Sequence, residues 1–334
     1  MRVSGTNGAR AGPNLSVDIG RVTLANPTIA ASGCYNRGAE FARIVDIAAY
    51  GAITLKSITR EPRLGNAMPR IALTPSGMLN AIGLQGPGIE YFVEHEAPKL
   101  VDVPTAVIAS VAGFTVGEFV DVAARMDGLP GIVAIELDVS CPNVDSEGEC
   151  FAVDPRATDA VLSAVKRRVK LPVIAKLTPN VADIRPIARA AEEAGADAIS
   201  LINSLRGMAI DVERTRPALA NGTGGLTGPA IRPIAVYQIW ETAQTVKVPI
   251  IGMGGVETGR DAIELMLAGA TAVAIGTANF RDPQVASRVS AALAAESSRR
   301  GFASVRALTG LANPGFAGAR WQADRRPKPV GAPS

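Results

Sequence analysis

The sequence predicts an α/β protein whose strands close into a (β/α)8 TIM barrel, with long active-site loops at the C-terminal face. Three observations lead to this fold. Eight short aliphatic runs alternate with longer segments of helical periodicity, polar residues gather where the runs end, and Ala-Gly-Ala closes two of the helical segments. Strands that alternate with helices form parallel sheets, and eight such units suffice to close a barrel.

The eight runs are short and rich in Val, Ile and Ala, which is typical of parallel strands buried on both faces. In chain order they are residues 27–32 (PTIAAS), 52–57 (AITLKS), 105–112 (TAVIASVA), 133–140 (VAIELDVS), 172–178 (PVIAKLT), 198–203 (AISLIN), 249–254 (PIIGMG) and 272–276 (AVAIG).

Helical repeats fall between most of these runs, for example at 157–169, 181–194, 229–246 and 258–268. Ala-Gly-Ala near Ala194 and Ala268 is a typical helix stop before the next strand. An open doubly wound sheet is the alternative, but no GxGxxG motif follows the first run.

Two connections, 59–88 and 205–228, are too long for plain loops and follow strand ends, so we expect them to fold over the barrel mouth. No second domain is evident. We expect a flexible N-terminus at 1–13, a single barrel domain at 14–324, and a basic, Pro-rich tail at 325–334.

The composition of the 334 residues narrows the function. It is 47% hydrophobic and 19% charged, which suits a compact enzyme, whereas 4% aromatic residues and a net charge of +3 disfavour a nucleic-acid partner. The three cysteines form no metal-type cluster, and an iron–sulfur centre needs about four thiolates, so we expect no metal. No run is long enough to span a bilayer, and we expect a cytoplasmic protein without a membrane partner.

Residues 133–144 carry the first candidate for chemistry. Pro142 cannot continue a central strand, so Cys141 lies at the C-terminal end of the fourth strand, which faces the active site in a barrel. A buried cysteine that only packs is the competing interpretation. Because His95 is the only histidine, we expect acid–base chemistry to use another residue.

Two lysines, Lys56 and Lys176, lie at the ends of buried strands. A lysine is almost never fully buried without a partner for its charge, so each needs an explanation. Either each forms a buried ion pair with a neighbour such as Glu136, or both face an anionic ligand. The glycines of 252–255 (GMGG) and Gly276-Thr277 follow the seventh and eighth strands, where barrels commonly bind phosphate. Residues 224–228 are expected to form a third, donor-rich turn.

With these features the chain resembles the class 1 dihydroorotate dehydrogenases, most closely the class 1B catalytic subunits, over residues 15–283. The motifs that carry the resemblance are ASG at 31–33, TLKSIT at 54–59, GMLNAIGLQGPG at 77–88, VSCPNV at 139–144, AKLTPN at 175–180, LINS at 201–204, GGLTGPAIRP at 224–233, GMGGV at 252–256 and AIGTANF at 274–280.

The resemblance implies a flavoprotein oxidoreductase that binds FMN and oxidises (S)-dihydroorotate to orotate in pyrimidine biosynthesis. Cys141 would be the base at C5, while C6 passes a hydride to the flavin. A thiol of reference pKa ~8.5 can be tuned for this role by nearby cations. Electrons would pass to NAD+ through a partner subunit that carries FAD and an iron–sulfur cluster. The assembly would be a heterotetramer, or a homodimer that uses a soluble acceptor such as fumarate.

The resemblance also implies roles for individual residues. The catalytic residues would be Cys141 and Lys56. The substrate-binding residues would be Lys56, Asn80, Ala81, Ile82, Gly83, Leu84, Asp138, Asn143, Asn203 and Ser204. The flavin-binding residues would be Ser32, Lys56, Ser57, Ser110, Asp138, Lys176, Ile202 and Gly228, with Gly254, Gly255, Gly276 and Thr277 at the phosphate.

Two positions depart from the family pattern. Asp138 stands where the pattern ELNISCPN has Asn, and Ser110 replaces an Asn that usually touches the flavin. An ionised carboxylate only accepts hydrogen bonds and repels anions. Asp138 is therefore protonated, or paired with a lysine, or suited to another substrate. The alternatives are an FMN enzyme acting on another reduced pyrimidine, a flavin-free aldolase or isomerase with a Schiff-base lysine, and a non-catalytic scaffold.

Overall fold

The computed structural model describes residues 12–36, 44–140 and 151–318. Eight parallel strands close into a barrel in chain order, and β16 pairs with β3 to complete it. Every predicted run overlaps one strand, so the predicted barrel is confirmed. The strands are β3 (Thr28–Ala30), β4 (Ala52–Thr54), β7 (Ala106–Val111), β8 (Ile132–Asp138), β9 (Val173–Lys176), β10 (Ala198–Leu201), β15 (Ile250–Met253) and β16 (Ala272–Ile275).

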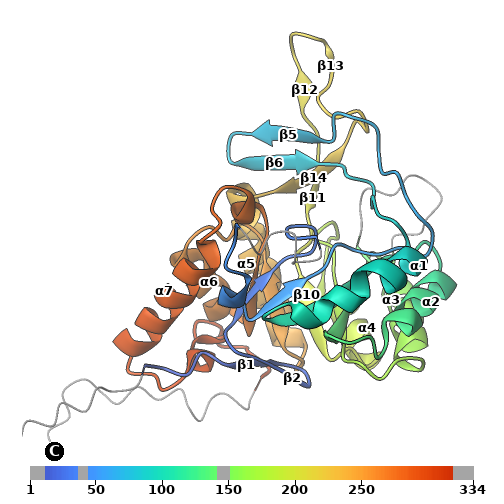
Figure 1. The fold of residues 1–334 in the computed structure, drawn as a ribbon. Helices are drawn as coiled ribbons and strands as arrows, with labels where there is room; N and C mark the ends of the chain where they lie inside the picture. Colours follow the sequence, from blue (N-terminus) through green and yellow to red (C-terminus); the bar gives the residue numbers. More distant parts are fainter. Residues whose placement is uncertain (1–11, 37–43, 141–150, 319–334) are drawn as a thin grey trace, which may run out of the picture.

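Helices cover the outside of the barrel (Figure 1). The four predicted helical segments overlap α3 (Pro155–Lys166), α4 (Arg185–Glu193), α5 (Arg232–Thr245) and α6 (Gly259–Ala268), and α3 begins two residues before its predicted segment. Further helices are α2 (Val116–Met126) and α7 (Val285–Arg299), with a helical stretch formed by α1 (Ile89–Tyr91), η2 (Phe92–Glu96) and η3 (Ala97–Asp102). A capping box between Thr258 and Asp261 fixes the start of α6.

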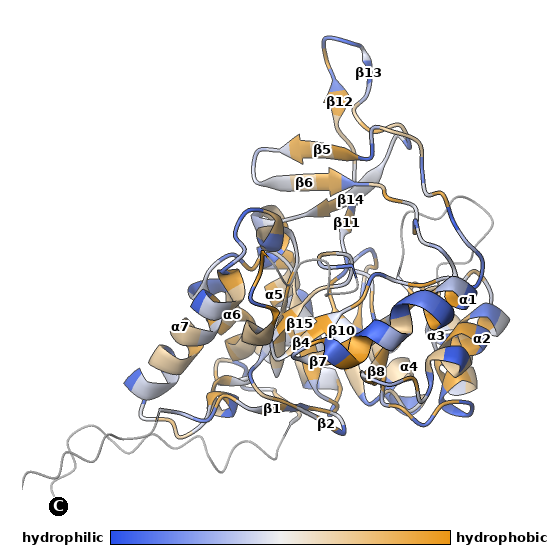
Figure 2. Ribbon diagram, viewed as in Figure 1, coloured by the Kyte–Doolittle hydropathy of each residue, from blue (hydrophilic) through white to orange (hydrophobic). Residues whose placement is uncertain are grey.

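The core consists of the barrel strands and the helix faces packed on them. Ile108, Ile135 and Ile199 are at most 1% exposed, and full burial of such a side chain stabilises the fold by about 1.5–3 kcal/mol. Figure 2 shows apolar residues concentrated on the strands and polar residues on the outer faces of the helices. Burial on both sides explains why the strand runs are almost continuously aliphatic.

The two long connections pair with each other above the barrel (Figure 1). They form a four-stranded antiparallel sheet, here called the cover sheet, in the order β11 (Leu205–Gly207), β14 (Gly224–Thr227), β6 (Gly77–Asn80) and β5 (Ile71–Thr74). The turn predicted at 224–228 was wrong for its first four residues, because they are β14. A hairpin of β12 (Ile210–Asp211) and β13 (Arg216–Pro217) extends beyond the cover sheet.

The remaining elements are short. Strands β1 (Val17–Ile19) and β2 (Val22–Leu24) form an antiparallel hairpin on the side of the barrel away from the cover sheet. Four short helices complete the described chain: η1 (Ile47–Ala49), η4 (Pro229–Ile231), η5 (Thr277–Phe280) and η6 (Val305–Leu308). Among the described residues, no helix is both long and apolar enough to cross a membrane.

Candidate active site

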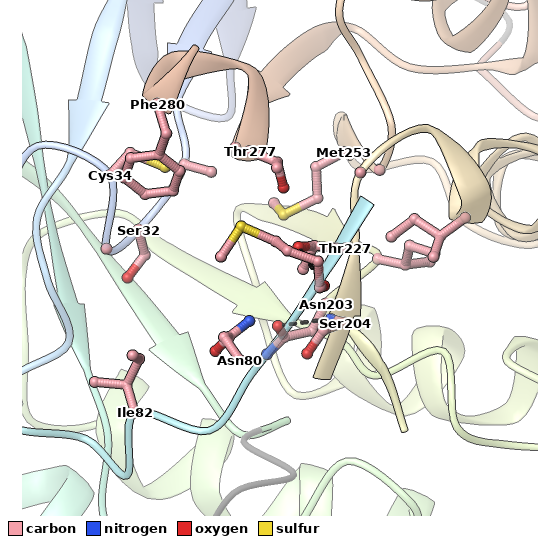
Figure 3. A pocket seen from close by; sticks show the side chains of 18 of the residues that line it. Ser32, Cys34, Asn80, Ile82, Asn203, Ser204, Thr227, Met253, Thr277 and Phe280 are labelled. Atoms are coloured by element: carbon pink, nitrogen blue, oxygen red, sulfur yellow. Dashed lines mark hydrogen bonds between the residues drawn. The ribbon is translucent and has the colours of Figure 1, made fainter. Parts of the chain in front are cut away.

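A cavity of about 520 Å³ opens between the barrel mouth and the cover sheet. Its volume lies within the usual range of about 300–1,000 Å³ for small-molecule sites. Figure 3 shows Cys34, Thr277 and Phe280 on one side of this cavity and Asn80, Asn203 and Ser204 on the other. Residues far apart in the sequence therefore meet around one space.

Most of the predicted site residues line this cavity. They are Ser32, Lys56, Ser57, Asn80, Ile82, Gly83, Leu84, Asp138, Lys176, Ile202, Asn203, Ser204, Gly228, Gly254, Gly255, Gly276 and Thr277. Ala81 and Ser110 are buried beside the wall and do not line it. Cys141 and Asn143 lie outside the described residues.

Lys176 forms a buried ion pair beneath the cavity. Its Nζ lies 3.7 Å from Oε1 of Glu136, and both side chains are less than 8% exposed. Oε2 of Glu136 accepts a hydrogen bond of 2.8 Å from Ser200. Burial raises the pKa of Glu136, and the nearby charge of Lys176 opposes that rise. Lys176 thus has the predicted ion pair and also faces the cavity, so the two interpretations of this lysine are compatible.

Asp138 is the acceptor at the centre of a polar network on the cavity floor. Its Oδ1 accepts hydrogen bonds from Ser140 Oγ at 2.9 Å and Asn203 Nδ2 at 3.3 Å. Its Oδ2 accepts one from Ser57 Oγ at 3.4 Å. Asn203 Nδ2 also donates to Ser140 Oγ at 2.7 Å. If the carboxylate of Asp138 is ionised, a ligand beside it must donate a hydrogen bond to it, and an anionic ligand would be repelled by its charge.

A chain of serine hydroxyls leads from Asp138 toward the far wall. The Oγ atoms of Ser57 and Ser110 are 2.9 Å apart, and those of Ser57 and Ser32 are 3.3 Å apart. Each hydroxyl can donate or accept. Ser110, at a position that departs from the family pattern, therefore contacts the wall residue Ser57 and lies one layer behind it.

The glycine turns after β15 have backbones that side chains would not permit. Gly254 and Gly255 have φ of 129° and 73°, in the region that favours glycine. A Cβ on Gly254 would lie 2.7 Å from Cβ of Ala235, and one on Gly255 would lie 2.8 Å from Cβ of Arg232. The absence of side chains lets the turn pack directly against α5 while Gly254 and Gly255 line the cavity, where their backbone can approach a ligand closely.

The cover sheet supplies the opposite wall. Asn80, at the end of β6, donates from Nδ2 to the carbonyl of Gly225 at 3.3 Å. A Cβ on Gly225 would lie 2.0 Å from Oγ of Ser204, so only glycine lets β14 pass this close to Ser204. The Oδ1 atom of Asn203 accepts a hydrogen bond from the Ser204 backbone at 2.8 Å. These contacts bring two amide side chains and a hydroxyl together at one end of the cavity.

Several wall residues were missed by the sequence predictions. They include Cys34, Ile71, Met78, Thr227, Ile231, Met253 and Phe280. Met253 and Phe280 lie inside the motifs GMGGV and AIGTANF, and this was the available signal. Burial raises the pKa of Cys34 from 9.0 to about 11, so the thiol stays protonated at neutral pH and is a poor nucleophile.

The family model and the similar proteins that match this chain all belong to one family. Residues 14–296 match the family model described as dihydroorotate dehydrogenase. Two similar proteins are both named dihydroorotate dehydrogenase B (NAD(+)), catalytic subunit. The protein of Citrifermentans bemidjiense is 51% identical over 83% of this chain and 91% of its own length, and that of Desulforudis audaxviator is 50% identical over 89% and 97%. The chain therefore belongs to the dihydroorotate dehydrogenase family.

Proposed function

We propose that this chain oxidises dihydroorotate to orotate in pyrimidine biosynthesis, with FMN as its bound cofactor. The observation that carries the proposal is a single cavity at the barrel mouth that combines open glycine turns, two lysines and a cluster of amides. Enzymes of this family use a flavin in general, and the names of the relatives specify dihydroorotate as the substrate of those proteins.

The walls of the cavity suit the parts of FMN. The turns at Gly254-Gly255 and Gly276-Thr277 would receive the phosphate, and Ile202 and Met253 offer apolar surface to the ring system. Lys176, paired with Glu136, would supply positive charge to the ring. When bound, FMN supplies the acceptor for the hydride that leaves C6 of the substrate.

The residues of the chain would bind the substrate and move its proton. Asn80, Asn203 and Ser204 would hydrogen-bond the pyrimidine ring and its carboxylate, and Lys56 would contact both substrate and cofactor. Cys141 would take the proton from C5, a contribution typically of 10²–10⁴-fold for general base catalysis. Cover-sheet residues such as Asn80 would help to exclude bulk water from this end of the cavity once a ligand is bound.

The names of the relatives give NAD(+) and a catalytic subunit, which supports a proposal for the electron acceptor and a partner subunit. We infer that electrons pass to NAD+ through a partner subunit with FAD and an iron–sulfur cluster, in a heterotetramer built on a dimer of this chain. The enzyme would act in the cytoplasm as one barrel domain spanning 14–324.

A second candidate is an FMN enzyme that acts on another reduced pyrimidine. Asp138 favours it, because its carboxylate faces the cavity and accepts hydrogen bonds from Ser140 and Asn203. A neutral substrate with a ring N–H would pair with this carboxylate better than an anion.

The test is the visible spectrum of the purified chain, followed by anaerobic addition of dihydroorotate. We expect a flavin spectrum that bleaches within seconds, and a Cys141→Ala variant that keeps the spectrum but bleaches ~10²–10⁴-fold more slowly. A yellow protein that dihydroorotate leaves oxidised would favour the second candidate. A colourless protein that does not take up added FMN would contradict both.

A further inference from the structure

A buried polar cluster lies behind the cavity wall that is expected to hold the flavin phosphate. Oδ1 of Asn279 accepts a hydrogen bond from the Tyr35 hydroxyl at 3.0 Å and a second one from the Tyr50 hydroxyl. Nδ2 of Asn279 donates to the carbonyl of Ile275 at 2.7 Å. All three polar side chains are at most 5% exposed, and Asn279 itself does not line the cavity.

The cluster joins Asn279 to two segments that lie 244 and 229 residues earlier in the sequence. Asn279 belongs to η5, which starts at Thr277 and follows Gly276, and both of these residues line the cavity. Tyr35 directly follows the wall residues Gly33 and Cys34. Tyr50 precedes β4 and packs its ring on Tyr35, with centroids 5.7 Å apart. One amide therefore connects the turn after β16 to the turn after β3.

The donors of this cluster stay uncharged. Burial raises the pKa of both Tyr35 and Tyr50, so each hydroxyl keeps its proton and needs an acceptor. Asn279 provides that acceptor and, with its other amide atom, holds the last carbonyl of β16. A side chain without an amide would remove the acceptor that the two hydroxyls share and one donor to the carbonyl of Ile275, which also accepts from the backbone of Ala31. The tie between the two turns would then be weakened, and the segments could shift.

We propose that Asn279 is a positioning residue that fixes the backbone of Gly276 and Thr277 for the phosphate of FMN, and so sets the preference for FMN over riboflavin. This role rests on the proposed binding of FMN. It goes beyond simple stabilisation, because the bond to Ile275 holds the chain one residue before Gly276. Riboflavin lacks the phosphate, so its binding depends far less on the placement of these two residues.

The experiment measures the dissociation constants of FMN and riboflavin for the flavin-free full chain by quenching of flavin fluorescence. We expect Asn279→Ala to weaken FMN binding about tenfold more than riboflavin binding, which corresponds to the loss of about one hydrogen bond in placement. The ratio of the riboflavin dissociation constant to the FMN dissociation constant measures the preference for FMN. Tyr50→Phe, which removes one hydroxyl and keeps the ring, should lower this ratio by a smaller factor than Asn279→Ala.

Asn313→Ala is the matched control. Asn313 is also a buried asparagine, it donates to the carbonyls of Trp240 and Ala268, and it does not line the cavity. We expect this variant to lower the melting temperature without changing the ratio of the two constants. An unchanged ratio in Asn279→Ala would overturn the proposal; if that variant does not fold, an unchanged ratio in Tyr50→Phe overturns it.

The outcome also separates this role from the proposed function. If the unaltered chain prefers FMN and the Asn279 and Tyr50 variants keep that preference, only the positioning role fails. If the unaltered chain binds neither flavin, the proposed function fails and the positioning role fails with it.

Discussion

Replacing Asp138 by asparagine removes a negative charge from the cavity floor and keeps the shape of the side chain. The network can adapt to this change. Oδ1 keeps its two donors, Ser140 and Asn203, and the new amide nitrogen can donate to Ser57, whose contacts with Ser32 and Ser110 can run in either direction. We therefore expect the stability of the variant to change by less than about 1 kcal/mol.

The effect on an anionic ligand is larger. At an effective dielectric constant of about 20, two unit charges separated by ~6–12 Å, the span of a cavity this size, repel each other by about 1.4–2.8 kcal/mol. Removing the Asp138 charge should thus tighten the binding of orotate, the anionic product, by about 10- to 100-fold. The same change removes a charge that raises the pKa of Glu136, so the pair with Lys176 should persist.

The assay is a titration of the oxidised enzyme with orotate, followed by the change in flavin absorbance near neutral pH. The control is Asp127→Asn, because Asp127 follows α2 and accepts hydrogen bonds from the backbone of Lys170 and Leu171 and does not line the cavity. Equal or weaker orotate binding by Asp138→Asn would refute the reasoning.

Two further predictions concern the cavity wall. Gly254→Ala should weaken FMN binding strongly, since its φ is 129° and the new Cβ would meet Ala235. The control is Gly128→Ala, at a φ of 83° with no atom within 4 Å of the new Cβ. This control should cost about 1–2 kcal/mol of stability and leave FMN binding unchanged. Cys34, whose pKa is raised from 9.0 to about 11, contributes stability below pH 9 that is lost as pH rises toward 11. Chemical denaturation at pH 8 and 11 should therefore show a loss in the native chain that exceeds the loss in Cys34→Ala by about 2–3 kcal/mol, and parallel losses would contradict the assigned burial.

The barrel could be predicted because its signal is local. Each strand is buried on both faces, so it appears as an aliphatic run, and polar residues such as Lys176 and Asn203 stand out at its end. The cavity wall followed from that pattern and from the family motifs. Asp138 could be recognised as a departure, but two of its three donors, Ser57 and Asn203, follow β4 and β10, and only the folded chain brings them to it.

The cover sheet and the Asn279 cluster could not be predicted in the same way. Strand β14 begins with Gly224-Gly225, a pair typical of turns, and it is a strand because it pairs with both β6 and β11. Glycine is required there because Ser204 leaves no room for a Cβ at Gly225. The partners of Asn279 lie 244 and 229 residues away in the sequence. No periodicity or motif in the sequence predicts that β14 pairs with β6, or that Asn279 bonds to Tyr35 and Tyr50.

The cover sheet also links ligand binding to the integrity of the whole chain. Its inner strands, β6 and β14, belong to the excursions after β4 and β10, and they pair through residues such as Asn80 and Gly225. A ligand held between this sheet and the barrel binds only the state in which these two excursions are joined, so its binding energy adds to the cost of separating them. The first and second halves of the barrel thus become thermodynamically coupled through the occupant of the site.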